Sequence, residues 1–150
     1  GYRHPSSEET LREKVVDEYG NIRSDEQGYM QGGDVFNFVI REIPRDIKKT
    51  LEYAGDTADS FDYIVFHQAN NFINAYIAKK MKLDTDKIPS TIAKYGNTSS
   101  VSVPLTIVSE LKDRLYGNKK LLLSAFGVGM TWATGIVPFV DCKISDIVEV

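Results

Sequence analysis

His67 is the residue whose type and position first suggest chemistry. It directly follows Tyr63–Phe66, a short apolar run rich in β-branched and aromatic residues that predicts a buried strand. Open α/β folds bind ligands at the carboxyl ends of their strands, so a histidine at this point is a candidate site residue. The alternative is a core histidine satisfied by the backbone, and its position alone leaves both interpretations open.

Two further features could complete a site with His67. Asn97 lies in a polar segment, Tyr95–Ser100, between apolar stretches. Val128 stands between two glycines in Phe126–Met130, which predicts a tight turn between two apolar strands. A histidine, an asparagine and the backbone N–H groups of a turn are donors that stabilise a developing oxyanion. No nucleophile is among them.

The composition narrows the classes of function. The chain has 150 residues, 42% of them hydrophobic, as in one globular domain. Its 18 basic and 21 acidic residues give a net charge of −3, which argues against a nucleic-acid surface. No apolar run is long enough to span a membrane, and the histidines and cysteine show no metal-ligand spacing. Cys142, the single cysteine, suits a reducing compartment such as the cytoplasm, and we interpret it as an incidental thiol.

Helical and strand patterns alternate along the chain, which predicts an α/β fold with a mainly parallel sheet covered by helices. Apolar residues at three- and four-residue steps predict a helix capped by Asp34, kinked at Pro44 and ending near Gly55. The other expected elements are a strand at 63–66, a helix through 73–81, a short strand at 88–93, a helix from 99 to 117, and strands at 120–126 and 130–140.

The first part of the chain is less regular than the rest. Residues 1–33 are expected to be an irregular lead-in with a short polar helix near Glu8, because glycines punctuate them as turns. A globular domain seldom begins with so much irregular chain, so we expect an amino-terminal half to be missing before it. Residues 34–140 are expected to form the domain and residues 141–150 a tail.

Four motifs carry a resemblance to a known family. At His67–Asn70 (His-Gln-Ala-Asn) and Gly96–Ser100 (Gly-Asn-Thr-Ser-Ser) the sequence resembles the carboxyl-terminal half of 3-oxoacyl-(acyl carrier protein) synthase III. These are thiolase-fold condensing enzymes of bacterial fatty acid synthesis. Met30–Phe36 is similar to the family's helix entry, and Ala125–Trp132 to its closing glycine-rich turn. The resemblance covers roughly residues 28–140 and implies the carboxyl-terminal half of a thiolase-like fold.

The resemblance also implies roles for individual residues. His67 and Asn97 match the second and third members of the family's Cys-His-Asn triad, whose cysteine lies in the missing amino-terminal half. Family enzymes load an acyl group from coenzyme A onto that cysteine and condense it with malonyl-carrier protein after decarboxylation. His67 and Asn97 would then donate hydrogen bonds to the malonyl thioester oxygen, and the N–H of Val128 would help to form an oxyanion hole. For His67 to donate, an acceptor elsewhere in the fold has to fix its tautomer.

The same resemblance implies substrates and partners. Asn70, Lys79 and Lys80 match positions on the face where acyl carrier protein or coenzyme A approaches, and basic residues there suit an acidic carrier protein. Many family members have an arginine where this chain has Phe72, which leaves the choice between carrier protein and coenzyme A open. The expected substrates are acyl-CoA and a malonyl thioester, with no cofactor and no metal. We expect a homodimer, no nucleic-acid or membrane partner, and little activity from this chain alone.

Two alternatives stay open. One is another thiolase-fold acyl transfer, for instance in secondary metabolism. The other is a non-catalytic binding module of the same fold. The presence of both His67 and Asn97 at the family spacing favours decarboxylative condensation over either of them.

Overall fold

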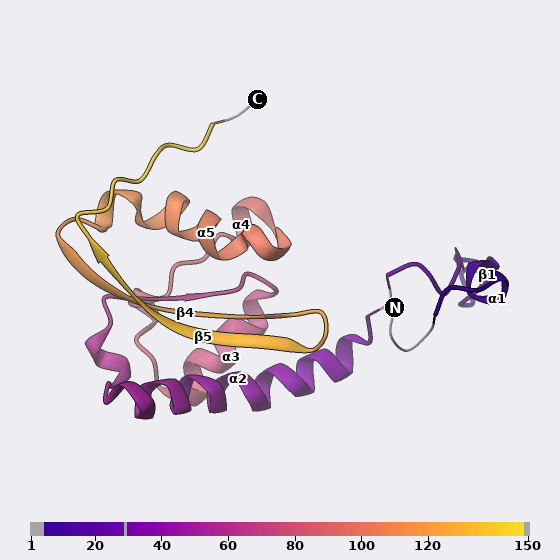
Figure 1. Ribbon diagram of the computed structural model, residues 1–150, viewed down its shortest axis with the longest axis horizontal. Helices are drawn as coiled ribbons and strands as arrows, with labels where there is room; N and C mark the ends of the chain where they lie inside the picture. The colour runs from indigo at the N-terminus through magenta and orange to yellow at the C-terminus, as the bar shows by residue number, and fades with distance from the viewer. Residues whose placement is uncertain (1–4, 29, 149–150) are drawn as a thin grey trace. The chain divides into compact units, whose positions relative to one another are not determined.

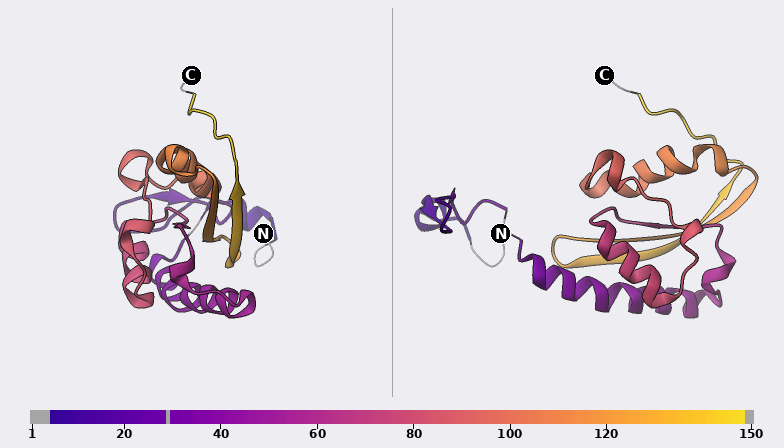
Figure 2. Two further views of the ribbon diagram at one scale, coloured as in Figure 1. Left: turned by 90° about the vertical axis from the view of Figure 1, so that its left-hand side faces the viewer. Right: turned by 180° about the vertical axis from the view of Figure 1, so that it is seen from behind.

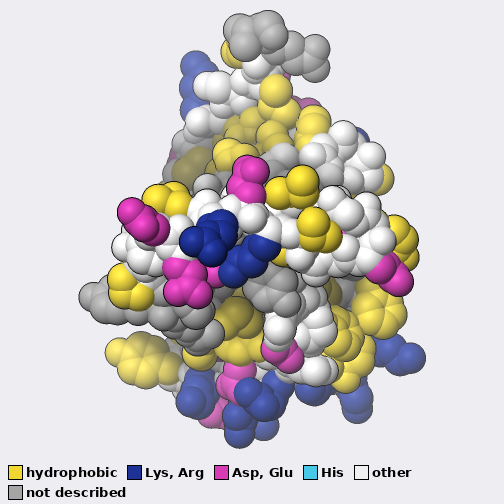
Figure 3. Space-filling view, turned by 90° about the vertical axis from the view of Figure 1, so that its right-hand side faces the viewer, with side chains coloured by type: hydrophobic (Ala, Val, Ile, Leu, Met, Phe, Trp, Pro, Cys, Tyr) yellow, Lys and Arg dark blue, Asp and Glu magenta, His cyan; other side chains and the backbone are white. Residues whose placement is uncertain are grey.

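The computed structural model describes residues 5–28 and 30–148, and the chain forms two compact units, residues 1–35 and residues 36–150 (Figure 1). Within the described residues, no helix is both long enough and apolar enough to cross a membrane. Figure 3 shows one face of the molecule, on which basic and acidic side chains lie beside one another and hydrophobic side chains are also exposed.

The described part of the first unit contains a short helix and two strands, although the glycines in its sequence predict an irregular segment. Helix α1 (Glu8–Leu11) starts with a capping box, in which the Ser7 hydroxyl accepts from the N–H of Thr10 and the Thr10 hydroxyl accepts from the N–H of Ser7. Strands β1 (Lys14–Val15) and β2 (Ile22–Arg23) pair antiparallel. The short helix expected near the start of the lead-in is therefore confirmed.

Helix α2 (Gly32–Ala54) presents one apolar stripe. It begins before Asp34, which lies in the first turn, so the prediction that Asp34 caps the helix is wrong. A carboxylate in the first turn still favours the helix through its dipole. Gly55 adopts φ +66°, the left-handed conformation that commonly ends helices, and the predicted end is confirmed. The buried residues of α2 are Val39, Ile43, Pro44, Ile47 and Leu51.

Three strands form the sheet, in the order β3 (Tyr63–Phe66), β4 (Asn118–Gly127) and β5 (Thr131–Val140). Strand β3 runs parallel to β4, with Phe66 opposite Ser124. Strands β4 and β5 pair antiparallel over their whole length, because the glycine-rich turn reverses the chain between them. The parallel pairing predicted for the sheet is thus confined to β3 and β4.

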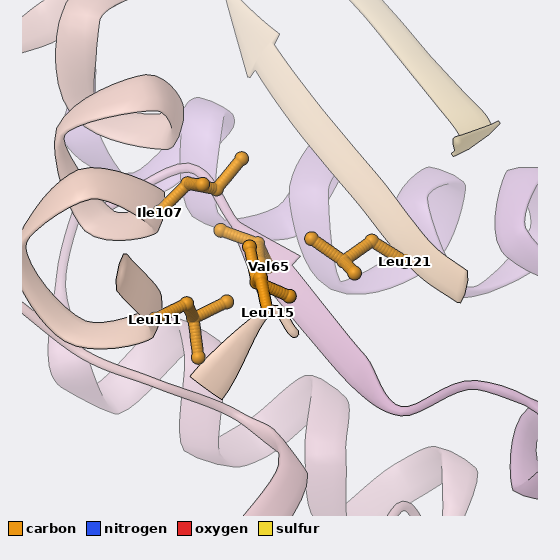
Figure 4. Close-up of a cluster of buried hydrophobic side chains, with 5 residues drawn as sticks. All are labelled: Val65, Ile107, Leu111, Leu115 and Leu121. Atoms are coloured by element: carbon orange, nitrogen blue, oxygen red, sulfur yellow. The ribbon is translucent and has the colours of Figure 1, made fainter. Parts of the chain in front are cut away.

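Helices cover both faces of this sheet, as predicted. In Figures 1 and 2, α4 (Ile92–Tyr95) and α5 (Ser102–Thr106) lie on one side, and α2 and α3 (Asn71–Met81) lie on the other. The face toward α5 carries a cluster of buried apolar side chains that Figure 4 shows meeting at one point. We call it the α5 core cluster; its members are Val65, Ile107, Leu111, Leu115 and Leu121. Strand side chains alternate, so Ile64, Phe66 and Leu122 point toward α2 and α3.

The segment after α3 differs from the prediction in one place. The short strand predicted at 88–93 is wrong, because α4 starts at Ile92 and the residues before it are loop. Pro89 has no N–H for a strand ladder, and the N–H of Thr91 donates to the side chain of Gln68. The helix predicted from 99 to 117 is confirmed in place. It is assembled from a 3₁₀ turn, α5, a π-helical stretch at Ile107–Leu111 and a second 3₁₀ turn.

Candidate active site

His67 leaves β3 at the carboxyl end of the parallel pair, where it was expected. Its N–H donates to the C=O of Ser124 on β4 at 2.9 Å, and its C=O accepts from Nδ2 of Asn74 at 3.2 Å. The half-buried imidazole meets the ring of Phe126 edge-on, with 5.2 Å between the ring centroids. Burial lowers the pKa of His67 below its usual value, so the ring is neutral near pH 7. A neutral imidazole can donate one hydrogen bond and accept another.

A hydroxyl contacts the histidine where the sequence predicts an acceptor. Nδ1 of His67 lies 2.6 Å from Oγ of Ser102, the first residue of α5. The same Oγ accepts from the N–H of Gln68 at 3.3 Å. A neutral ring that donates from Nε2 has an unprotonated Nδ1, so the group that fixes its tautomer must be a donor. A serine hydroxyl can donate or accept, so it can fill this donor role, and the acceptor expected from the sequence stays a prediction.

Asn97 lies in the loop that follows α4. Gly96, at φ +66°, ends that helix. The exposed side chain of Asn97 accepts from the N–H of Ser99 through Oδ1 at 2.9 Å, which leaves the amide Nδ2 as the end that can donate. Among the hydrogen bonds of the described residues, none joins Asn97 to His67. The fold brings their segments together through Ser102, five residues after Asn97, and the predicted role of Asn97 stays a prediction.

Val128 is at the tip of the turn between β4 and β5 and is 99% exposed. Its C=O accepts from the hydroxyl of Thr131 at 2.9 Å. Gly129 adopts φ +128°, and a Cβ there would lie 2.9 Å from Cγ2 of Thr131, so the turn requires a glycine. Phe126, which packs on His67, belongs to the same hairpin. The oxyanion role of the Val128 N–H stays a prediction.

Asn70 and Phe72 begin the helix after the histidine. Asn70 is the N-cap of α3, and its Oδ1 accepts from the N–H of Phe72 at 2.7 Å. Phe72 is 65% exposed and stacks on Phe36 at 5.7 Å between centroids. The observed role of Asn70 is therefore structural, and an aromatic surface occupies the position where the resemblance implies an arginine.

The comparison with known proteins agrees with this geometry. Residues 51–139 match the sequence model of the family described as 3-oxoacyl-[acyl-carrier-protein (ACP)] synthase III C terminal. The chain belongs to this family. The resemblance is thereby confirmed, and the fold is the carboxyl-terminal half of a thiolase-like α/β fold.

Individual relatives of this synthase III carboxyl-terminal half point the same way. A beta-ketoacyl-[acyl-carrier-protein] synthase III of Streptococcus gordonii is 44% identical over 112 residues, which cover 72% of this chain and 34% of the relative. A solved 3-oxoacyl-(acyl-carrier protein) synthase from Burkholderia xenovorans is 42% identical with a TM-score of 0.75, covering 79% of this chain and 34% of that one. A second solved 3-oxoacyl-(acyl-carrier-protein) synthase III is 37% identical with a TM-score of 0.78. The match covers 91% of this chain and 40% of that one. The chain thus spans about a third of the length of the curated relatives it matches.

Lys80, implied by the resemblance to meet a carrier protein or coenzyme A, has a structural contact in this synthase III domain. Its Nζ donates to the C=O of Ile40 on α2 at 2.7 Å. Pro44, four residues after Ile40, has no N–H, so α2 cannot supply the usual donor to that carbonyl. Lys80 therefore replaces the hydrogen bond that the proline removes. Lys79, its neighbour, is exposed in the last turn of α3.

Replacing Lys80 by alanine should lower the free energy of unfolding by about 1 kcal/mol, because the Ile40 carbonyl loses its partner. In a Pro44→Ala background the cost of Lys80→Ala should shrink, since alanine returns a backbone N–H to that carbonyl. Urea unfolding of the four members of this cycle measures the difference. Lys79→Ala is the control and should leave the midpoint unchanged; an equal cost of Lys80→Ala in both backgrounds would contradict the assignment.

A surface hollow at the opposite end of the sheet is separate from this site. Its lining includes Asp62 and Lys119, at the amino ends of β3 and β4, and Pro138, near the carboxyl end of the antiparallel β5. His67, in contrast, follows the carboxyl end of β3. Asp62 accepts from the N–H of Lys120 at 2.8 Å and pairs with Lys119 at 3.0 Å. These contacts, led by the backbone N–H, lower the pKa of Asp62. The ion pair and the backbone bond join the loop before β3 to β4, a structural role.

Proposed function

We propose that this chain is the carboxyl-terminal part of a condensing acyltransferase of the synthase III type, which joins an acyl thioester to a malonyl thioester in fatty acid synthesis. The family match and the names of the relatives support this class of enzyme. The observation that carries the proposal is a neutral His67 at the carboxyl end of β3, with Nδ1 engaged by Ser102. That arrangement leaves Nε2 to donate to a substrate.

The proposed reaction begins with the malonyl thioester. The bond between the α-carbon and the carboxylate breaks, carbon dioxide leaves, and the electron pair moves onto the thioester oxygen as an enolate. Nε2–H of His67 and Nδ2–H of Asn97 donate to that oxygen. Preorganised donors of this kind each contribute about 2.7–4 kcal/mol of transition-state stabilisation.

The second stage joins the two chains. The α-carbon of the enolate attacks the carbonyl carbon of an acyl group held as a thioester on a cysteine. The resulting tetrahedral oxyanion receives a hydrogen bond from the N–H of Val128, and the cysteine thiolate departs as the carbonyl re-forms. We place this cysteine in an amino-terminal half outside the chain, where coenzyme A delivers the acyl group. Cys142, in the exposed tail, is not assigned this role.

The proposal includes partners. A homodimer of the full-length protein would receive acyl carrier protein or coenzyme A on the face bearing Asn70, Lys79 and Lys80. Exposed ammonium groups there suit an acidic carrier protein. The chemistry needs no cofactor beyond the substrates, and we place it in the cytoplasm. By itself the chain should form no 3-oxoacyl product, because the nucleophile that holds the acyl group is not in it.

The test is release of carbon dioxide from a malonyl thioester by the full-length protein. A condensing enzyme should release it with or without an acyl donor and form a 3-oxoacyl product when one is present. Binding of the thioester without release of carbon dioxide would overturn the proposal in favour of a non-catalytic module. Formation of a 3-oxoacyl product by the isolated chain would instead contradict the placement of the nucleophile.

A further inference from the structure

Four buried polar residues form a closed ring of hydrogen bonds behind His67. Thr91 donates from its N–H to Oε1 of Gln68 at 3.0 Å, and its hydroxyl lies 2.9 Å from that of Thr106. The Thr106 hydroxyl donates to the C=O of Ser102 at 2.8 Å, and Ser102 Oγ accepts from the N–H of Gln68. Each of the four residues is at most 1% exposed. We call them the Gln68 ring.

The ring determines how the Ser102 hydroxyl is used. Its oxygen already accepts from the N–H of Gln68, and its own hydrogen needs an acceptor. Nδ1 of His67, at 2.6 Å, is the acceptor that the described contacts offer. If Nδ1 of His67 were the donor instead, the hydrogen of the Ser102 hydroxyl would be left buried without a partner, which is costly. The geometry therefore points to donation from Ser102 to the histidine.

We propose that Ser102 is a positioning residue that holds His67 as the tautomer protonated on Nε2. The Gln68 ring supports it from behind, since it fixes Ser102 through both its hydroxyl and its carbonyl. The catalytic meaning of this tautomer rests on the proposed function, because Nε2–H is the donor to the enolate. The tautomer itself does not depend on any reaction.

The ring has a second consequence for the site. Thr91 and Ser102 flank the segment that carries Asn97, and both are tied to Gln68, the residue next to His67. The two ends of the loop are thus fixed to the end of β3. The Gln68 ring therefore keeps the Asn97 segment close to His67, although no described hydrogen bond joins those two side chains.

The test is ¹⁵N NMR of the chain labelled at histidine, in a His4→Gln background that leaves His67 as the single histidine. His4 lies outside the described residues. At neutral pH, Nδ1 should give a pyridine-like shift and Nε2 a pyrrole-like shift. This measurement needs no change at the site, so it decides the tautomer even if a variant fails to fold. A pyrrole-like Nδ1 would overturn the proposal.

Substitutions then identify the donor. Ser102→Ala should reduce the preference for the Nε2 tautomer about fivefold, the value of one ordinary hydrogen bond. Ser102→Thr keeps the hydroxyl and should restore the preference. Ser100→Ala changes an exposed serine nearby and should keep the wild-type tautomer. An unchanged ratio in Ser102→Ala would show that something else sets the tautomer.

The two proposals fail separately. A full-length protein that does not decarboxylate a malonyl thioester would refute the function and leave the tautomer result intact. A wrong tautomer in a protein that does decarboxylate would refute the role of Ser102 alone.

Discussion

Replacing His67 by alanine in the full-length protein should lower the rate of malonyl thioester decarboxylation by about 10²–10³. The backbone N–H of His67 binds Ser124 at the end of β3, and its imidazole contacts the ring of Phe126 and the hydroxyl of Ser102. Alanine keeps the backbone contact and removes the donor to the enolate oxygen. The rate of carbon dioxide release at saturating thioester measures the effect, and it should fall with little change in KM, because the lost bond strengthens as charge develops.

Asn97→Ala should produce a loss of similar size, and the double variant should lose less than the product of the two, because both donors act on one oxygen. Asn37→Ala, at an exposed position of α2, is the matched control and should keep the wild-type rate. The idea fails if His67→Ala decarboxylates at the wild-type rate. A loss confined to the acyl-loading step would place His67 beside the cysteine instead of the malonyl oxygen.

Much of the site could be predicted because its signals are local. The strand before His67 is a run of four residues, and the asparagine that caps α3 follows within a few positions. Hydrophobic periodicity located α2, α3 and the segment after Ser99, since each buries a face along its own length. The resemblance predicts that Asn97 and Val128 belong to the same site.

What could not be predicted depends on contacts between distant segments. Ser102 meets His67 across 35 positions, and no sequence pattern marks a serine at the start of a helix as a partner of a histidine. The strand expected at 88–93 failed for the same reason: the Gln68 side chain holds the N–H of Thr91 and lets a helix begin there. From the sequence, Lys80 is a surface charge. The fold shows that it binds the C=O of Ile40, which has no helical donor because Pro44 lacks an N–H.

The α5 core cluster should carry much of the stability of the second unit. Leu111 is completely buried within it, on a π-helical stretch packed against β3 and β4. Leu111→Ala should lower the free energy of unfolding by about 2–5 kcal/mol, because it removes apolar contacts and leaves a cavity that the surrounding strands cannot close. Urea unfolding followed by circular dichroism gives this difference, which is a large part of the total stability of an ordinary domain.

Val101→Ala is the control on the same helical segment, since Val101 is 51% exposed and its truncation should change stability by less than about 0.5 kcal/mol. If Leu111→Ala cost no more than this control, the cluster would be able to repack around the loss. The wider π-helical turn would then be loosely held, and Ser102, one turn earlier, could not be fixed by the packing of this segment. The Gln68 ring alone would have to hold the serine against His67. A large loss of stability in Leu111→Ala would instead show that the packing of this segment is firm. The segment that fills the core would then also hold the Ser102 hydroxyl against His67.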